Sequence, residues 1–160
     1  GEEDAEFLAE KLSRQEIRYL YTSTERKAIQ TGEIIGKRLG LPTHSNAGLC
    51  EHDRTGVGYL SNEDFQQAIL NLFTKHDERI FGAESGQEAV DRVEAEICRI
   101  ENETQGPNQT IACVTHGTVM SLLAARWSGL DGHKLWQRLT MRSTITINRE
   151  DLTIVSIEID

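Results

Sequence analysis

The sequence predicts an α/β fold, a three-layer αβα sandwich whose central sheet is mostly parallel. Short β-branched, apolar segments alternate with segments whose apolar residues recur every three to four positions, which is the spacing of one helix face. Strands that alternate with helices favour a parallel sheet covered on both faces. The chain has 160 residues, 38% of them apolar and 27% charged. This size and composition fit one globular domain over residues 1–160.

The first half of the chain is expected to form a helix, a strand and a second helix. Residues 17–22 are β-branched and aromatic, as in a strand. Thr24 is placed to cap the second helix, and Gly40 followed by Pro42 ends it. An extended segment then continues to about Cys50. The inner faces of the two helices are expected to comprise Ala5, Leu8, Ala9 and Leu12, and Ala28, Thr31, Ile35 and Leu39.

The second half begins with a loop over residues 50–60, which is charged and lacks periodicity. One helix starts at Ser61, and another starts at the capping box Ser85-Gly86-Gln87-Glu88. Residues 111–115 form a short apolar strand that leads directly into a helix. Residues 145–147 and 154–159 alternate apolar and polar side chains, which predicts a closing pair of strands.

The charge balance and the cysteines limit the possible partners. A net charge of −9 argues against nucleic acid and anionic membranes, because too few cations are present to neutralise a row of phosphates. The same net charge still permits binding of one small phosphorylated ligand by a few local cations. The chain contains no apolar stretch long enough for a transmembrane helix. Its three cysteines are odd in number and widely spaced, which favours a reducing, cytoplasmic compartment.

Two strand-to-helix junctions carry candidate site residues, and ligands of such sheets bind at this edge. The first junction runs from Ser23 through Arg26, which falls in the first helical turn. A cation there is unfavourable unless an anion binds, and a guanidinium holds phosphate with two hydrogen bonds. The alternative is a surface arginine paired with a nearby glutamate.

At the second junction His116 leaves an apolar strand as the helix begins, and Gly117 allows a close approach of backbone to ligand. A histidine that only caps the helix or fills the core is the alternative. Glu51 opens the charged loop, where a shielded carboxyl can serve as a general acid near neutral pH. The alternative for Glu51 is a solvated loop charge.

Other kinds of site find little support. Cys50, His52 and Asp53 are close in sequence, but no second cluster supplies further metal ligands at the usual spacing, so no metal is expected. No GxSxG elbow, P-loop or GxGxxG occurs, and no cofactor is expected.

Taken together, the junctions resemble the histidine phosphatase superfamily, also called the phosphoglycerate-mutase-like family. Four elements occur in the family's order and span nearly the whole chain. They are Ser23-Thr24-Glu25-Arg26-Lys27-Ala28-Ile29-Gln30-Thr31, similar to S-x-x-x-R-A-x-Q-T; Leu49-Cys50-Glu51 with Gly56; Gly82-Ala83-Glu84-Ser85 with Arg92; and Thr115-His116-Gly117.

The resemblance implies a phosphohistidine mechanism, in which a histidine of an early Arg-His-Gly motif attacks phosphorus. Carried over to this chain, Arg26 would bind the phosphoryl oxygens and His116 would donate a hydrogen bond to them. Ser23 and Gly117 belong to the same phosphate-binding junctions. Glu51 would protonate the leaving oxygen and then activate water. Each role suits a displacement whose charge spreads over the equatorial oxygens.

One family element is missing, because no Arg-His-Gly occurs in the 160 residues. The family's first strand and its nucleophile are therefore expected to lie outside this chain, and the domain is interpreted as N-terminally incomplete. Residues 1–160 alone should therefore be inactive. A naturally shortened, inactive member is the other account, and a strand donated by another chain is a third. Because the lost strand is central in the family, two inner strands are expected to lack partners, which would favour homo-oligomers.

The function expected from the resemblance is hydrolysis of a small phosphomonoester. A mutase of the phosphoglycerate type is the sister hypothesis. The modest stretch between Glu51 and His116 lacks a long inserted lid, which favours the phosphatase. An inactive module that binds a phosphorylated ligand or a partner is the alternative from another class.

Overall fold

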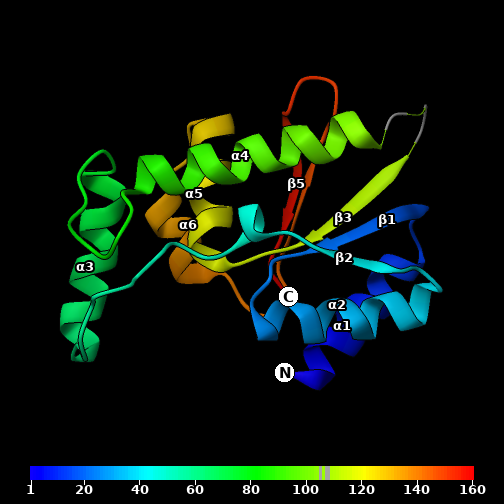
Figure 1. The fold of residues 1–160 in the computed structure, drawn as a ribbon, viewed down its shortest axis with the longest axis horizontal. Coiled ribbons are helices and arrows are strands. Elements are labelled where there is room, and N and C mark those ends of the chain that lie inside the picture. Colours follow the sequence, from blue (N-terminus) through cyan, green and yellow to red (C-terminus); the bar gives the residue numbers. More distant parts are fainter. Residues whose placement is uncertain (105, 107–108) are drawn as a thin grey trace.

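A computed structural model describes residues 1–104, 106 and 109–160. Its central sheet has three parallel strands in the order β2–β1–β3, formed by Thr43–Ser45, Ile17–Thr22 and Thr110–Val114. Helices lie on both faces of this sheet (Figure 1). The expected αβα sandwich with a parallel sheet is confirmed.

Alternation along the central strands divides the core in two. Leu20 of β1 is buried against α1 (Glu2–Ser13) and α2 (Arg26–Leu39). Its neighbour Tyr21 points to the opposite face and joins the core under α4 (Gly86–Glu103) and α5 (Gly117–Ser128). This period of two places one apolar layer on each side of the sheet. The sheet is therefore fixed by packing from both faces.

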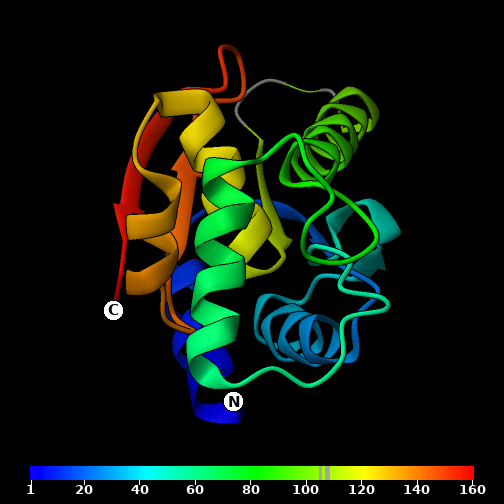
Figure 2. The same cartoon turned by 90° about the vertical axis from the view of Figure 1, so that its left-hand side faces the viewer.

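The remaining elements are a 3-10 turn, two helices and a second sheet. A 3-10 turn (Ala47–Leu49) follows β2, and α3 (Asn62–Thr74) packs against α6 (Gly132–Arg138). The closing strands β4 (Thr144–Ile147) and β5 (Ile154–Glu158) pair antiparallel as a separate sheet beside α6 (Figure 2). The expected strand pair is confirmed. No helix in the described ranges combines the length and hydrophobicity needed to cross a bilayer.

Two local expectations are wrong, and one helix was not expected. Thr24 does not cap α2: Glu25 takes that position, and the Thr24 hydroxyl lies 3.1 Å from Cys50 Sγ. The short helix α6 was not expected, because it has only seven residues and little apolar periodicity. The inner strand β1 does not lack a partner, since it pairs with β2 on one edge and with β3 on the other.

Candidate active site

The carboxyl ends of β1 and β3 bring the two junctions together. Thr22 lies opposite Val114 in the parallel register, and the Ser23 amide donates to the Val114 carbonyl at 3.0 Å. The residues that follow these strands, Ser23 and His116, therefore leave the sheet side by side. This is the edge at which the sequence placed the ligand.

His116 is held by two polar groups from the first junction. It stands at the N-cap position of α5, its side chain is buried, and its Nε2 lies 2.6 Å from Ser23 Oγ and 3.2 Å from Glu25 Oε1. A carboxylate only accepts hydrogen bonds, so we assign the hydrogen to Nε2. Burial lowers the pKa of His116, which favours the neutral imidazole.

Glu25 links His116 to Glu51. Burial alone would raise the pKa of Glu25, but the hydrogen bond from the Glu51 amide and the nearby His116 lower that pKa overall. The Glu51 amide donates to Glu25 Oε1 at 2.7 Å. Glu25 is therefore an ionised carboxylate that joins residues far apart along the chain. Sequence reasoning missed it, because a glutamate at a helix start has no distinctive pattern.

The Glu51 carboxylate lies at the N-terminus of α5. The amides of Thr118 and Val119 each donate to one of its oxygens at 3.3 Å. The positive end of the helix dipole favours an anion at this position. His116 and Glu51 thus flank the same helix start, so the structure brings together two of the three principal site candidates.

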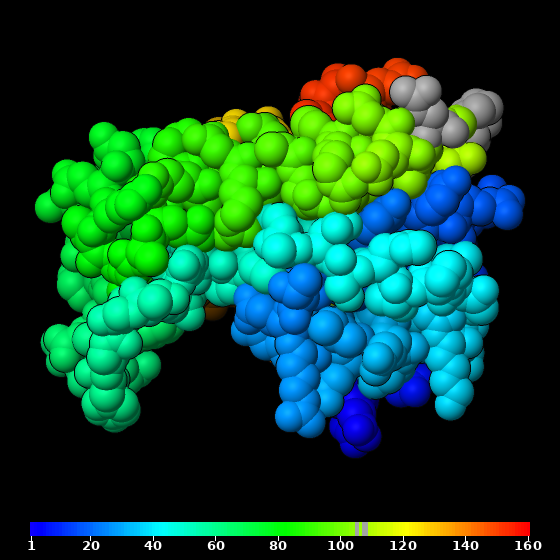
Figure 3. All heavy atoms as spheres, viewed as in Figure 1, coloured from blue at the N-terminus to red at the C-terminus, as the bar shows by residue number. Residues whose placement is uncertain are grey.

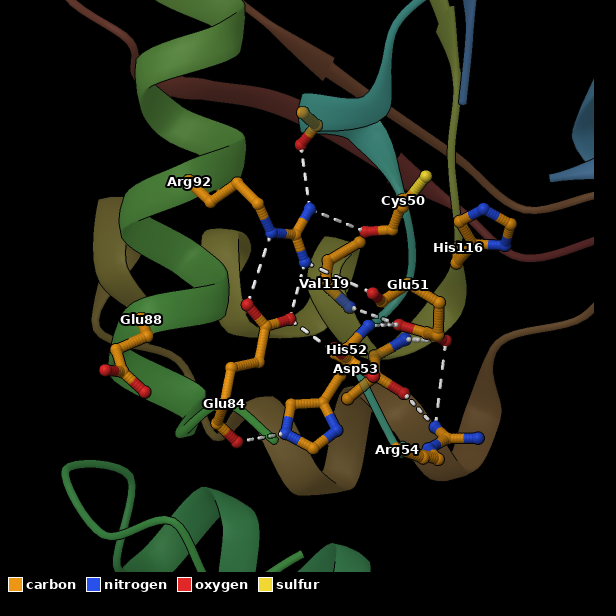
Figure 4. A network of polar contacts seen from close by, with 12 residues as sticks. Cys50, Glu51, His52, Asp53, Arg54, Glu84, Glu88, Arg92, His116 and Val119 are labelled. Carbon is orange, nitrogen blue, oxygen red and sulfur yellow. Dashed lines mark hydrogen bonds and ion pairs between the residues drawn. The ribbon is translucent and has the colours of Figure 1, made fainter. Parts of the chain in front are cut away.

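Arg92 fixes the segment that carries Glu51 (Figure 4). From α4 its guanidinium donates to the carbonyls of Gly48, Cys50 and Glu51 at 2.9–3.1 Å. It also forms two hydrogen bonds with Glu84, at 3.2 and 2.6 Å. The chain direction at Glu51 therefore depends on a side chain that follows it by 41 residues.

Arg26, the third candidate, is the first residue of α2, and its side chain is exposed. Within the described ranges it forms no ion pair or side-chain hydrogen bond. Counted from Ser23, the arginine of the S-x-x-x-R-A element falls on Lys27. Lys27 Nζ lies 3.4 Å from Glu25 Oε2, and its charge contributes to the low pKa of His116, after the larger effect of burial.

Arg54 is a second cation that sequence reasoning passed over as a loop charge. Its Nη2 donates to Thr118 Oγ1 at 3.0 Å and lies 3.8 Å from Glu51 Oε2. Its charge also contributes to the low pKa of His116. The pattern Glu51-x-x-Arg54 was visible in the sequence, but the contact with Thr118 spans 64 residues and was not.

Two cavities are lined in part by residues of this site. Gly117 lines one of about 650 Å³, together with Trp136, Leu139 and Met141. Arg54 lines the other, of about 450 Å³. Figure 3 shows the surface hollowed between the segment near residue 60 and the start of α2. In the described part of the chain no group of three or more histidine, cysteine or acidic side chains could hold a metal ion.

Comparison with known proteins identifies the family of this fold. The family model of the histidine phosphatase superfamily (branch 1) matches residues 1–160. The chain belongs to this superfamily. No curated protein matches the chain.

Solved structures of histidine phosphatase fold resemble the chain over most of its length. A mycobacterial glucosyl-3-phosphoglycerate phosphatase in complex with VO3 has a TM-score of 0.77 at 18% identity, and the match covers 99% of this chain and 83% of that one. The α-ribazole phosphatase from Shigella flexneri has a TM-score of 0.68 at 24% identity, with coverage of 97% and 80%. A phosphoserine phosphatase mutant from Entamoeba histolytica has a TM-score of 0.67 at 16% identity, with coverage of 97% and 80%. At these identities the likeness supports the fold.

Proposed function

We propose that this superfamily member is a phosphatase for small phosphomonoesters and that the reaction proceeds through a phosphohistidine. The observation that carries the proposal is the meeting of Ser23, His116 and Glu51 at one helix N-terminus, joined through Glu25. A cytoplasmic location, inferred from the cysteines, belongs to the same proposal.

The phosphoryl group is proposed to bind at the junction of β1 and β3. Its oxygens would accept from the amide of Gly117, a residue that lines the larger cavity, and from His116 Nε2, whose hydrogen would turn from Glu25 to the ligand, with Ser23 alongside. Two carboxylates stand nearby, so a phosphate also needs cations. We place one of them at Lys27, because its charge reaches His116, and keep Arg26, the preceding residue, as the alternative.

The proposed reaction balances with water as the only co-reactant. A histidine nucleophile outside residues 1–160 forms an N–P bond while the P–O bond to the leaving group breaks. Glu51, in its acid form, gives its proton to the leaving oxygen. Water then attacks phosphorus, Glu51 takes up a proton, and the N–P bond breaks to release phosphate. Transfer to a second hydroxyl in place of water would make the protein a mutase, and binding without transfer would make it an inactive module.

The residues upstream of Gly1 in the parent gene separate the enzyme from the binding module. A parent protein that carries Arg-His-Gly should hydrolyse p-nitrophenyl phosphate without added metal, whereas residues 1–160 alone should show no turnover. Replacement of His116 by alanine should remove most of that activity. Parallel Lys27→Ala and Arg26→Ala variants identify the phosphate cation, and His76→Ala, on an exposed loop, is the matched control.

Full activity in His116→Ala and in both cation variants would refute these roles. Turnover by a clean preparation of residues 1–160 would show that the nucleophile lies within them.

A further inference from the structure

Arg54 connects the candidate active site to a cavity that the proposed chemistry does not use. Its guanidinium carbon lies 5.3 Å from the centroid of the Phe65 ring and 5.4 Å from that of Phe81. Cation–π contacts of this kind hold the flat guanidinium in place. The side chain is only half-buried, so part of it remains open to a ligand.

One guanidinium nitrogen of Arg54 is held by a hydrogen bond, but the guanidinium has further N–H donors. Nη2 donates to Thr118 Oγ1, whereas the 3.8 Å separation from Glu51 Oε2 is too long for a hydrogen bond. A guanidinium has five N–H donors; Nε of Arg54 is buried, so the donors that remain for a ligand oxygen are those of its terminal nitrogens. The position beside Glu51 is where the leaving oxygen of a phosphomonoester would lie.

The cavity lined by Arg54 has about 450 Å³, within the size range of small-molecule sites. Among its lining residues in the described ranges Arg54 alone carries a charge. Apolar and aromatic side chains make up most of the rest: Val57, Tyr59, Leu60, Phe65 and Phe81. Tyr59 is 99% exposed, so its ring is free to pack on an occupant.

We propose that this cavity binds the organic group of the substrate and that this group is uncharged and aromatic or apolar. The inference rests on the proposed function, because it takes the phosphoryl group to lie between His116 and Glu51. Ser61 and Asn62 also line the cavity, but a sugar or polyol would still place some of its hydroxyls against Val57, Leu60 and Phe65, which is unfavourable. An aromatic group instead stacks between Tyr59 and the apolar wall, and Arg54 binds the bridging oxygen.

The test compares three ligands of the same chain by NMR: inorganic phosphate, glycerol 2-phosphate and 1-naphthyl phosphate. All three should shift the amide of Gly117. Only naphthyl phosphate should also shift Tyr59 and Leu60, and it should bind at least about tenfold more tightly than glycerol 2-phosphate.

Two variants attribute this preference to the cavity. Leu60→Asn should reduce the preference for naphthyl phosphate to less than about threefold and leave the affinity for inorganic phosphate unchanged. Arg54→Met, which keeps a long side chain without the charge, should weaken binding of all three ligands by about tenfold. Val155→Asn, on the exposed side of β5, is the control and should change nothing.

The results that would contradict this proposal differ from those that would contradict the proposed function. Equal affinity for naphthyl and glycerol 2-phosphate, with inorganic phosphate still bound at Gly117, overturns this proposal and leaves the proposed function standing. Binding of none of the three ligands overturns both. An unchanged naphthyl preference in a folded Leu60→Asn protein also contradicts the assignment of the cavity.

Discussion

Replacement of Arg92 by alanine should destabilise the protein strongly, although the residue is not in the catalytic group. The change removes three hydrogen bonds to the carbonyls of residues 48, 50 and 51 and the paired contact with Glu84. The Glu84 side chain is only 16% exposed, so its charge would be left poorly solvated.

The expected size follows from these contacts. A hydrogen bond to a charged group contributes about 1.5–3 kcal/mol, and breaking a buried ion pair costs about 3–5 kcal/mol. Part of this is regained, because the carbonyls of the half-buried segment can turn to water. We expect Arg92→Ala to lower the free energy of unfolding by about 3–5 kcal/mol. For a chain of this length the corresponding fall in Tm is about 8–15 °C.

Urea denaturation followed by tryptophan fluorescence measures the loss, and Arg14→Ala is the control. The Arg14 side chain is 77% exposed and pairs with Glu10, which is 61% exposed. Such exposed pairs contribute at most about 1 kcal/mol. Equal stability of the Arg92→Ala and Arg14→Ala proteins would refute the idea that Arg92 holds the Glu51 segment in place.

Three further predictions test the surroundings of the site. Gly82→Ala should lower the free energy of unfolding by about 2 kcal/mol or more, because φ is +110° and a Cβ there would lie 2.2 Å from the Asp53 carbonyl oxygen. Gly58→Ala, where an added Cβ would have no atom within 4 Å, should change the free energy of unfolding little in the same urea titration. Burial lowers the pKa of His52, so on acidification the unfolded chain takes up a proton before the folded one, and the free energy of unfolding falls as the pH drops below about 6.5. His52→Gln should therefore reduce the loss of unfolding free energy between pH 7.5 and 5.5, and an equal loss in the variant would contradict this. Burial raises the pKa of the Cys113 thiol to about 12, so iodoacetamide at pH 8 should leave it unmodified in the native protein, and labelling of this cysteine in peptide maps before unfolding would count against its burial.

Local patterns in the sequence predicted most of the elements. The capping box at Ser85 forms as expected, with Ser85 Oγ accepting from the Glu88 amide and Glu88 bonding back. Gly40 ends α2 in the left-handed conformation, as its position indicated. These features depend on residues within one helical turn, so a single sequence contains the information. The expected cap at Thr24 does not form, because α2 begins one residue later and the Thr24 hydroxyl contacts Cys50 instead.

The sheet partners and the polar network could not be predicted in the same way. Pairing of β1 with β3 depends on residues about 90 positions apart, and no local pattern specifies it. Arg92 and Glu84 were visible as parts of a family element, yet their contacts with the Glu51 segment span tens of residues. The same holds for Arg54 and Thr118. Long-range polar contacts such as these become visible only in three dimensions.

A crystal structure of the chain with tungstate, a heavy analogue of phosphate, would show where a phosphoryl group binds. We expect one strong anomalous peak at the start of α5, within hydrogen-bonding distance of the Gly117 amide and the His116 ring. A peak bound only by exposed cations elsewhere, with the start of α5 empty at saturating tungstate, would contradict the claim that these residues surround a phosphoryl group.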